Sequence, residues 1–259
     1  MNSSILNNPV YLINLKHRTD RYDHMMSLLE DKGFTDIRVV RPIIGDDVAR
    51  QRLIALGFLS PSASLPRNII SHISTYLSIM LNAQEDYFTI MEDDLSIQSI
   101  GLSLDTIHNL IPTDFDLFFM EYCYEDCRVE VVSDQRIVDS KAVNLIKKMY
   151  SPLCLGAVHY NGASIDKILS NFKNETHQID HWFKNAINDN RIEAYGTYKP
   201  LFVQDKRFGT DLQHKGLFSL SNLIFGTAGR PCKQQGISKV FSLFLVSGLL
   251  FSYLKGERR

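Results

Sequence analysis

Short apolar runs alternate with amphipathic segments along the first part of the chain, and this alternation predicts an α/β fold. Val10–Leu15 is apolar and rich in β-forming residues, as expected of a buried strand in a parallel sheet. Asp20–Lys32 carries apolar residues at helical spacing and is followed by Gly33, a common helix stop. Ile37–Val40 is the next predicted strand. This β-α-β opening indicates an open, Rossmann-like, mostly parallel sheet flanked by helices.

The same criteria place further elements along the chain. Predicted helices are Val48–Leu56, Asn68–Ala83, Ala163–Phe172 and Asp180–Asn188, and predicted strands are Tyr87–Met91, Asp116–Met120, Leu153–Tyr160 and Leu201–Val203. Ser140–Tyr150 fits neither pattern clearly. Because no repeat or low-complexity linker interrupts the pattern, we predict one domain over residues 1–215 and a separate tail over 216–259.

The tail contains a long uncharged segment. Val240–Leu254 holds no charged residue in fifteen positions, and Lys239 and Lys255 flank it. As a helix it would be about 22 Å long, which is short against a hydrocarbon core of about 30 Å. Two interpretations stay open: an apolar helix docked on the domain or a partner, and a peripheral membrane anchor with basic ends.

Composition and charge narrow the class of protein. Hydrophobic residues make up 44% and charged residues 22%, which is typical of a globular protein. The formal net charge of −1 at pH 7 gives no overall attraction to nucleic acid, so we expect no nucleic-acid partner.

The cysteines and the N-terminus bear on the compartment. Cys123 and Cys127 lie close in sequence, but neither Cys154 nor Cys232 forms a second close pair that would complete a zinc site. Reduced cysteines in a cytosolic protein are therefore the preferred interpretation. The N-terminus lacks the basic and apolar segments of a secretory signal. The predicted location is the cytoplasm, and if the tail is a membrane anchor, the cytoplasmic face of a membrane.

An acidic triplet, Glu92-Asp93-Asp94, directly follows the predicted strand Tyr87–Met91. Ligands of open α/β sheets bind at the carboxyl ends of the strands. Adjacent carboxylates repel one another, and a divalent cation relieves that repulsion with oxygen ligands that suit Mg²⁺ or Mn²⁺. An extended backbone would point Glu92 and Asp94 to one side and Asp93 away from it. The alternative is an acidic loop that caps a following helix.

Several segments together resemble glycosyltransferase family 25, the group of lipooligosaccharide and collagen galactosyltransferases. The matching segments, which occur in the family's order, are VYLINLKHRTDR from Val10, with Asn14, Leu15, Arg18 and Arg21 in the corresponding places, Ile70-Ser71-His72, Ile90–Asp94, Leu155–Ala163, Ile179-Asp180 and Pro200–Gln204. The resemblance spans roughly residues 9 to 212. Lys16 stands where the family commonly has an acid, and the strand around His159 departs from the family pattern.

This resemblance implies a GT-A-type nucleotide-sugar-binding fold. It also implies dependence on Mn²⁺ (or Mg²⁺), a UDP-sugar donor, often UDP-galactose, and inversion at the anomeric carbon. The function predicted in this way is transfer of a hexose, with galactose favoured, to a hydroxyl of a glycan, a lipooligosaccharide or a protein.

Roles for the acidic residues follow from this chemistry. A UDP leaving group gathers negative charge, which a divalent cation stabilises. We assign Asp94 as the principal metal ligand, Glu92 as a second ligand or ribose partner, and Asp93 as a contact to the donor sugar or a support for the ligands. His214, in a polar loop, is a candidate third ligand, although a surface histidine is the more common case.

The donor contacts are expected on two segments. Arg18 and Arg21 suit phosphate or uracil edges, with Arg21 preferred because Arg18 can instead pair with Asp20. Asn14, Ser71 and His72 are further candidates that the resemblance places near the donor.

Inversion by a single displacement needs a base that accepts the proton of the acceptor hydroxyl. Asp180 and Glu121 are the candidates, with Asp180 favoured. Asp180 lies at a predicted helix start, where it would also serve as an N-cap.

Two other classes of function compete with glycosyl transfer. A metal-dependent phosphatase or nucleotidyltransferase shares the strand-to-acid geometry, but the sequence lacks a second compact acidic motif. A non-catalytic scaffold related to the transferases is the other alternative, and the intact acidic triplet argues against it.

Overall fold

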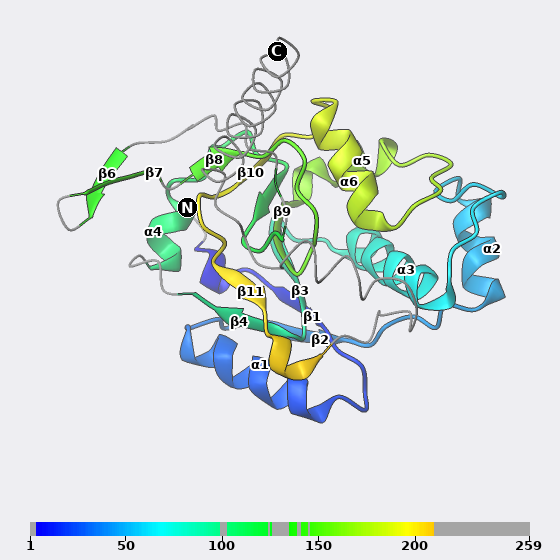
Figure 1. Ribbon diagram of the computed structural model, residues 1–259, viewed down its shortest axis with the longest axis horizontal. Coiled ribbons are helices and arrows are strands. Elements are labelled where there is room, and N and C mark those ends of the chain that lie inside the picture. Colours follow the sequence, from blue (N-terminus) through cyan, green and yellow to red (C-terminus); the bar gives the residue numbers. More distant parts are fainter. Residues whose placement is uncertain are drawn as a thin grey trace, which may run out of the picture. The chain divides into compact units, whose positions relative to one another are not determined.

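A computed structural model describes residues 4–98, 103–123, 125, 135–138, 141–144 and 146–209 (Figure 1). Its centre is a seven-stranded sheet in the order β2-β1-β3-β9-β5-β10-β8. The strands are β1 (Val10–Ile13), β2 (Ile37–Val40), β3 (Tyr87–Glu92), β5 (Leu117–Phe119), β8 (Ile146–Lys148), β9 (Ala157–Asn161) and β10 (Ala194–Thr197). Two small antiparallel pairs accompany the sheet: β4 (Leu95–Ile97) with β11 (Phe202–Gln204), and β6 (Gln135–Val138) with β7 (Lys141–Asn144).

The central sheet is mostly parallel. β1 runs parallel to both β2 and β3, and β5 runs parallel to β10. β9 pairs antiparallel with β3 on one side and with β5 on the other, so β3 and β5 run in the same direction. Only β8 and β9 run against the other five strands of this sheet. The predicted α/β class with a mostly parallel sheet flanked by helices is therefore confirmed.

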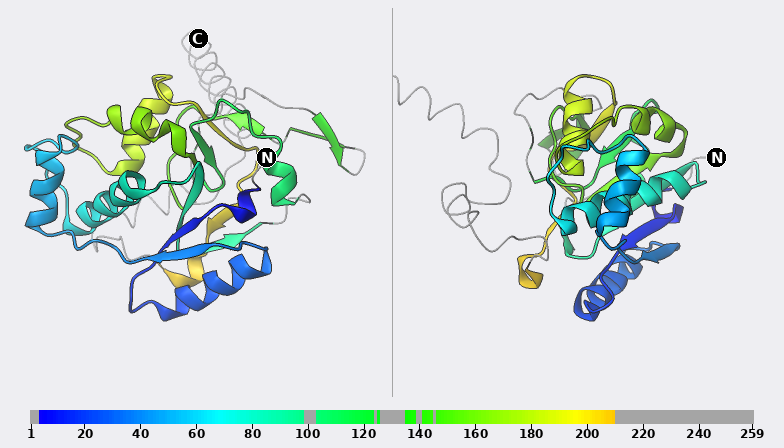
Figure 2. Two further views of the ribbon diagram at one scale, coloured as in Figure 1. Left: turned by 180° about the vertical axis from the view of Figure 1, so that it is seen from behind. Right: turned by 90° about the vertical axis from the view of Figure 1, so that its right-hand side faces the viewer.

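Helices cover both faces of the sheet (Figures 1 and 2). They are α1 (Thr19–Asp31), α2 (Asp47–Ala55), α3 (Arg67–Asn82), α4 (Leu104–His108), α5 (Ile165–Ser170) and α6 (Ile179–Asn188), with short 3-10 turns at Ile5–Asn7, Gly162–Ser164 and Lys206–Phe208. Apolar residues of α2, α3, α5 and α6 share one core, and those of α1 and α4 share another with β4 and β11. Alternate strand residues supply the two cores, because successive side chains of a strand point to opposite faces.

The predicted elements are found within a few residues of their expected ends. The predicted strand Leu153–Tyr160 begins only at Ala157 and is antiparallel, and the predicted helix Ala163–Phe172 is shortened to α5 by a 3-10 turn. The pattern missed β4, β6, β10 and α4, and it left open the segment Ser140–Tyr150 that contains β7 and β8. These elements have three to five residues each, which is too short for a periodic signal.

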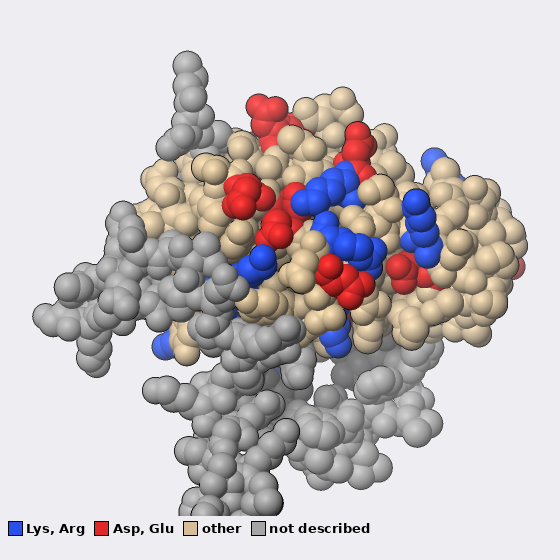
Figure 3. Space-filling view, turned by 90° about the horizontal axis from the view of Figure 1, so that it is seen from above, with Lys and Arg blue, Asp and Glu red and all other residues tan. Residues whose placement is uncertain are grey.

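The predicted tail and the predicted boundary between residues 215 and 216 lie outside the described residues, as does Val240–Leu254. Within the described ranges, no helix is long and apolar enough to cross a membrane. On the face drawn in Figure 3, basic and acidic side chains lie next to one another.

Gly45 brings the loop before α2 into contact with the start of α3. A Cβ at this position would overlap the carbonyl oxygen of Arg67 and lie 2.6 Å from the amide nitrogen of Ser71. The same loop accepts a hydrogen bond from the Ser71 hydroxyl at the Ile43 carbonyl. Only a residue without a side chain fits here, so Gly45 fixes the loop against the first turns of α3.

We expect Gly45→Ala to lower stability by about 1–3 kcal/mol, because the added methyl group meets backbone atoms that cannot move aside. For a domain of this size the melting temperature would fall by roughly 2–10 °C, measured by thermal denaturation. An unchanged melting temperature would contradict this close approach.

Candidate functional site

Polar residues gather where three parallel strands end. Asn14 follows β1, Asp93 and Asp94 follow β3, and Glu121 lies two residues beyond β5. The last residue of β1, Ile13, lies opposite Glu92 in the sheet register. Because the three strands run in the same direction, these residues share one edge of the sheet, where α/β proteins bind ligands.

The antiparallel strand β9 begins at the same edge. The carbonyl of Gly156, just before β9, accepts a hydrogen bond of 2.8 Å from the amide of Glu92. The Gly156 amide in turn donates to Glu121 Oε2 at 3.0 Å. The start of β9 therefore lies between the two acidic strand ends and binds both.

Asp93 is held by two partners from the N-terminal segment. Arg21 Nη1 lies 2.8 Å from Asp93 Oδ1, and both side chains are less than a tenth exposed. Asn14 Nδ2 donates to Asp93 Oδ2 at 2.7 Å. Both carboxylate oxygens of Asp93 are thus bound within the protein, which makes this residue an organiser of the site.

The chain bends at Asp93 and Asp94, so the expected alternation of side chains does not hold here. Asp94 Oδ2 lies 3.5 Å from the same Arg21 nitrogen that binds Asp93. Asp93 was expected to point away from its neighbours only if the backbone stayed extended, and the bend brings Asp93 and Asp94 to the same arginine.

Glu92 faces helix α3. His72 Nε2 lies 3.0 Å from Glu92 Oε1, and the Tyr76 hydroxyl reaches the same oxygen at 3.4 Å. Burial acts to raise the pKa of Glu92, but the hydrogen bonds of His72 and Tyr76 and the charge of Arg21 lower that pKa below its ordinary value. Glu92 is therefore ionised at neutral pH.

The pKa values of Asp94 and Glu121 are shifted in the opposite direction, above their ordinary values. Burial, followed by the charge of Glu92, raises the pKa of Asp94 to about 7 and that of Glu121 to about 8. Asp94 Oδ1 is buried and has no hydrogen-bond partner in the described part of the chain. This edge of the sheet therefore carries more carboxyl groups than its positively charged side chains neutralise.

A segment near the end of the described chain returns to this edge. The Asp205 amide donates to the Asp94 carbonyl at 2.6 Å, and β11 pairs with β4 immediately after the acidic triplet. Arg21 donates to the carbonyls of Phe208 and Gly209, and Arg18 donates to that of Phe208. Residues 202–209 thus cover the N-terminal arginines from one side.

The remaining predicted donor contacts are placed differently. Arg18 pairs with Asp20 at 3.0 Å, as the competing interpretation expected, and its side chain is 16% exposed. The Ser71 hydroxyl donates to the Ile43 carbonyl rather than to the acidic edge. His72 contacts Glu92, so the His72 side chain lies at the acidic triplet. His214 lies outside the described residues.

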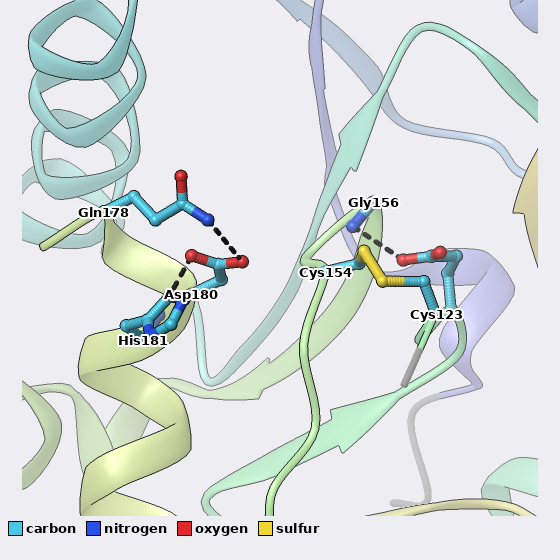
Figure 4. Close-up of a disulfide and its surroundings, with 7 residues drawn as sticks. Cys123, Cys154, Gly156, Gln178, Asp180 and His181 are labelled. Atoms are coloured by element: carbon cyan, nitrogen blue, oxygen red, sulfur yellow. Dashed lines mark hydrogen bonds between the residues drawn. A yellow bond between two sulfur atoms is a disulfide. The ribbon is translucent and has the colours of Figure 1, made fainter. Parts of the chain in front are cut away.

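Asp180 is the second residue of α6. The helix begins one residue earlier than predicted, with Gln178 as the N-cap. Asp180 Oδ1 accepts from the His181 amide at 2.9 Å, and Oδ2 accepts from the Gln178 side chain at 3.2 Å. Gln178 and not Asp180 is therefore the N-cap of α6, and both carboxylate oxygens of Asp180 have partners (Figure 4).

Two cysteines are oxidised, contrary to the sequence-based expectation. Cys123 and Cys154 form a disulfide across a sequence separation of 31 (Figure 4). Only the spacing of Cys123 and Cys127 drew attention in the sequence, and the pairing across the sheet edge gives no local signal. Cys127 and Cys232 lie outside the described residues.

Sequence reasoning missed Tyr76 and Gly156. Tyr76 is four residues after His72 on α3, so helical spacing places both on one face. That spacing was the available signal. Gly156 binds Glu92 and Glu121 through its backbone amide and carbonyl, and the sequence pattern does not predict a role of this kind.

The chemistry of this edge fits a divalent cation. Its donors are hard carboxylate oxygens, and one of them, Asp94 Oδ1, is buried without a partner. Among the described residues, no group of three or more His, Cys, Asp and Glu side chains forms a complete ligand set. Mg²⁺ and similar ions are commonly held by one or two carboxylates, with substrate phosphates and water completing the shell. An open site at Glu92 and Asp94 is of that kind.

The raised pKa of Glu121 predicts a pH dependence of stability in a chelating buffer. This carboxyl titrates near 4.5 in its ordinary state and near 8 in the folded protein. The folded state therefore binds the proton more tightly, and stability falls as the pH rises from about 4.5 to about 8. We expect Glu121→Gln to make this fall in melting temperature shallower.

The exposed Glu30 of α1 offers the matched control, since Glu30→Gln removes a carboxylate without changing the buried edge. Equal pH profiles for the Glu121 variant and the unaltered protein would contradict the assigned titration.

No protein-family model matches this sequence, and no curated protein matches it. Among solved structures, the chain is similar to the inositol-1-phosphate CTP transferase from T. maritima, with a TM-score of 0.38 and 8% identity over 81% of this chain and 94% of that chain. It is also similar to A197 from STIV, with a TM-score of 0.33 and 10% identity over 81% of this chain and 100% of that chain. At these TM-scores neither likeness carries an argument about activity.

Proposed function

We propose that this chain is a metal-dependent, inverting glycosyltransferase that moves a hexose from a UDP-sugar to an acceptor hydroxyl. The observation that carries the proposal is the buried acidic edge, in which Asp94 Oδ1 has no hydrogen-bond partner among the described residues. The sequence resemblance favours galactose as the sugar and a glycan, a lipooligosaccharide or a protein as the acceptor. Mn²⁺ is the preferred cation, with Mg²⁺ as the alternative.

Glu92 and Asp94 are the residues that would hold the cation. Glu92 is ionised and fixed by His72 and Tyr76, and Asp94 lies within the electrostatic reach of Glu92. A bound divalent cation lowers the pKa of neighbouring carboxyl groups and supplies Lewis-acid stabilisation to a departing diphosphate.

The start of α1 is the proposed site of the nucleotide phosphates. β1 leads through a short loop into α1, and phosphates bind at the N-terminus of the first helix in comparable β-α units. Arg18, at the N-cap position of α1, is partly exposed and is the guanidinium that we assign to the phosphates. Arg21 and Asn14 instead hold Asp93 in place.

Asp180 is the proposed base. Glu121 has its pKa raised to about 8, so it carries a proton at neutral pH and is poorly suited to accept one. Asp180 is only half-buried, and its two hydrogen bonds orient a carboxylate that can still receive a proton from an acceptor. In a single displacement the acceptor oxygen bonds to the anomeric carbon, its proton passes to Asp180, and UDP departs.

We predict that Asp94→Ala and Asp94→Asn lower UDP release from the preferred UDP-sugar by about 10²–10³-fold, because the departing charge loses its stabilisation. The assay is UDP release with Mn²⁺ across a panel of UDP-sugars. Binding of UDP with Mn²⁺, followed by thermal shift, should weaken in both variants.

Asp116→Asn is the matched control for this experiment. Asp116 is equally buried but precedes β5, at the opposite edge of the sheet, where Lys167 and the Glu193 amide bind it. Its loss should affect stability and spare UDP binding. Equal UDP release from the Asp94 variants would refute the metal assignment. Release of pyrophosphate from a nucleoside triphosphate would favour nucleotidyl transfer instead, phosphomonoester hydrolysis a phosphatase, and binding without turnover a scaffold.

A separate prediction concerns Asp180. We expect Asp180→Asn to lower kcat by about 10²–10⁴-fold, which is the usual contribution of a general base, while Mn²⁺ and UDP bind as before. Steady-state kinetics and calorimetry measure the two quantities. A loss of UDP binding that matches the loss of rate would instead assign Asp180 to the donor site.

A further inference from the structure

The disulfide between Cys123 and Cys154 joins two segments that carry groups of the acidic edge (Figure 4). Cys123 lies two residues after Glu121, and Cys154 lies two residues before Gly156. A backbone hydrogen bond of 3.1 Å from the Cys123 amide to the Leu153 carbonyl links the same two segments. The covalent bond therefore holds together two short stretches of chain, residues 121–123 and 153–156.

The second of these stretches positions both glutamates of the site. The Leu155 carbonyl accepts a bond of 2.8 Å from the Tyr76 hydroxyl, which also reaches Glu92. The Gly156 carbonyl accepts from the Glu92 amide at 2.8 Å, and the Gly156 amide donates to Glu121 at 3.0 Å. A shift of residues 155–156 would therefore alter the placement of Glu92 and Glu121 together.

The backbone at Cys154 depends on its surroundings to keep its conformation. Its φ of 70° lies in the left-handed region, which is unfavourable for a residue with a side chain. Such conformations persist when neighbouring contacts impose them. Once the disulfide opens, Cys154 can relax toward negative φ, and Leu155 and Gly156 would turn with it.

We propose that this disulfide is a redox control of the acidic edge, which holds the proposed cation ligand Glu92 and its neighbour Glu121 in place when oxidised and loosens them when reduced. The proposal rests on the function proposed above, because it concerns the cation site of that function.

The reductant is a dithiol, and the exchange balances through a mixed disulfide. Cys123 is exposed and Cys154 half-buried, so Cys123 is the sulfur open to attack. A thiolate of the dithiol bonds to Cys123 Sγ, and Cys154 leaves as a thiolate that takes up a proton. The second thiol of the reductant then displaces Cys123 as a thiolate, which is also protonated, and the reductant becomes a disulfide. The protein gains two electrons and two protons in total.

The test uses full-length Cys127→Ser/Cys232→Ser protein, in which only Cys123 and Cys154 can react. Mn²⁺ binding is measured by calorimetry on the oxidised protein, on protein reduced with dithiothreitol and desalted, and on reoxidised protein. We expect at least a tenfold rise in Kd on reduction and a return of the original Kd on reoxidation. Adding Cys123→Ser/Cys154→Ser should give the weaker Kd regardless of dithiothreitol.

A second measurement is independent of the metal. Hydrogen exchange of residues 153–161 should be faster in the reduced protein, while α1, which is remote in sequence, should keep its exchange rates. If the double serine variant does not fold, Cys154→Gly replaces it, because glycine adopts positive φ without penalty. That variant should bind Mn²⁺ more tightly than the reduced protein.

An unchanged Kd together with unchanged exchange on reduction would overturn the redox proposal and leave the disulfide as a purely structural bond. Absence of Mn²⁺ binding to the oxidised protein would overturn the proposed function, and the exchange measurement would still decide whether the disulfide controls this edge.

Discussion

The excess of acidic groups over basic groups at one buried edge of the sheet is the constraint around which the described site is arranged. Glu92, Asp93, Asp94 and Glu121 meet there, and their contacts are Arg21 with Asp93 and Asp94, and His72 with Glu92. Burying a charge without compensation costs several kcal/mol. The four carboxyl groups are stabilised in different ways. Asp93 forms an ion pair with Arg21 and accepts a hydrogen bond from Asn14, and Glu92 contacts His72 and Tyr76. Asp94 and Glu121 have raised pKa values instead, so they hold their protons more tightly.

The topology of the sheet explains why these groups meet. Strands β1, β3 and β5 deliver residues to one edge because they run in the same direction, and β9 contributes the start of a strand at that edge because it runs the opposite way. A strand start offers free backbone groups just before pairing begins. Gly156 uses its backbone amide and carbonyl on Glu121 and Glu92. The start of β9 thereby connects the acidic end of β3 to the acidic end of β5, the two strands between which β9 lies.

The sequence predicted the parts of this arrangement that depend on local pattern. The strand before the acidic triplet, the helix with His72 and the β-α-β opening all have strong periodicity, and each is found where expected. The pairing of Arg21 with Asp93 spans 72 residues, and the disulfide spans 31. Such contacts depend on how the strands are ordered, which periodicity does not determine. The bend at Asp93 and Asp94 likewise follows from tertiary contacts, including the bond from the Asp205 amide.

The different roles of Arg18 and Arg21 affect how the cation and the donor bind. Arg21 is buried and held by Asp93 and by the carbonyls of Phe208 and Gly209, so its charge already serves the protein. A nucleoside diphosphate arriving at the start of α1 would add negative charge beside Asp94, which shares Arg21 Nη1 with Asp93 at the longer distance of 3.5 Å. The helix N-terminus offers only about half a positive charge. A divalent cation is attracted by the acidic edge and by the phosphates at once, so each ligand raises the affinity for the other. Under the proposed function, cation and donor therefore bind as a coupled pair, and each increases the affinity for the other.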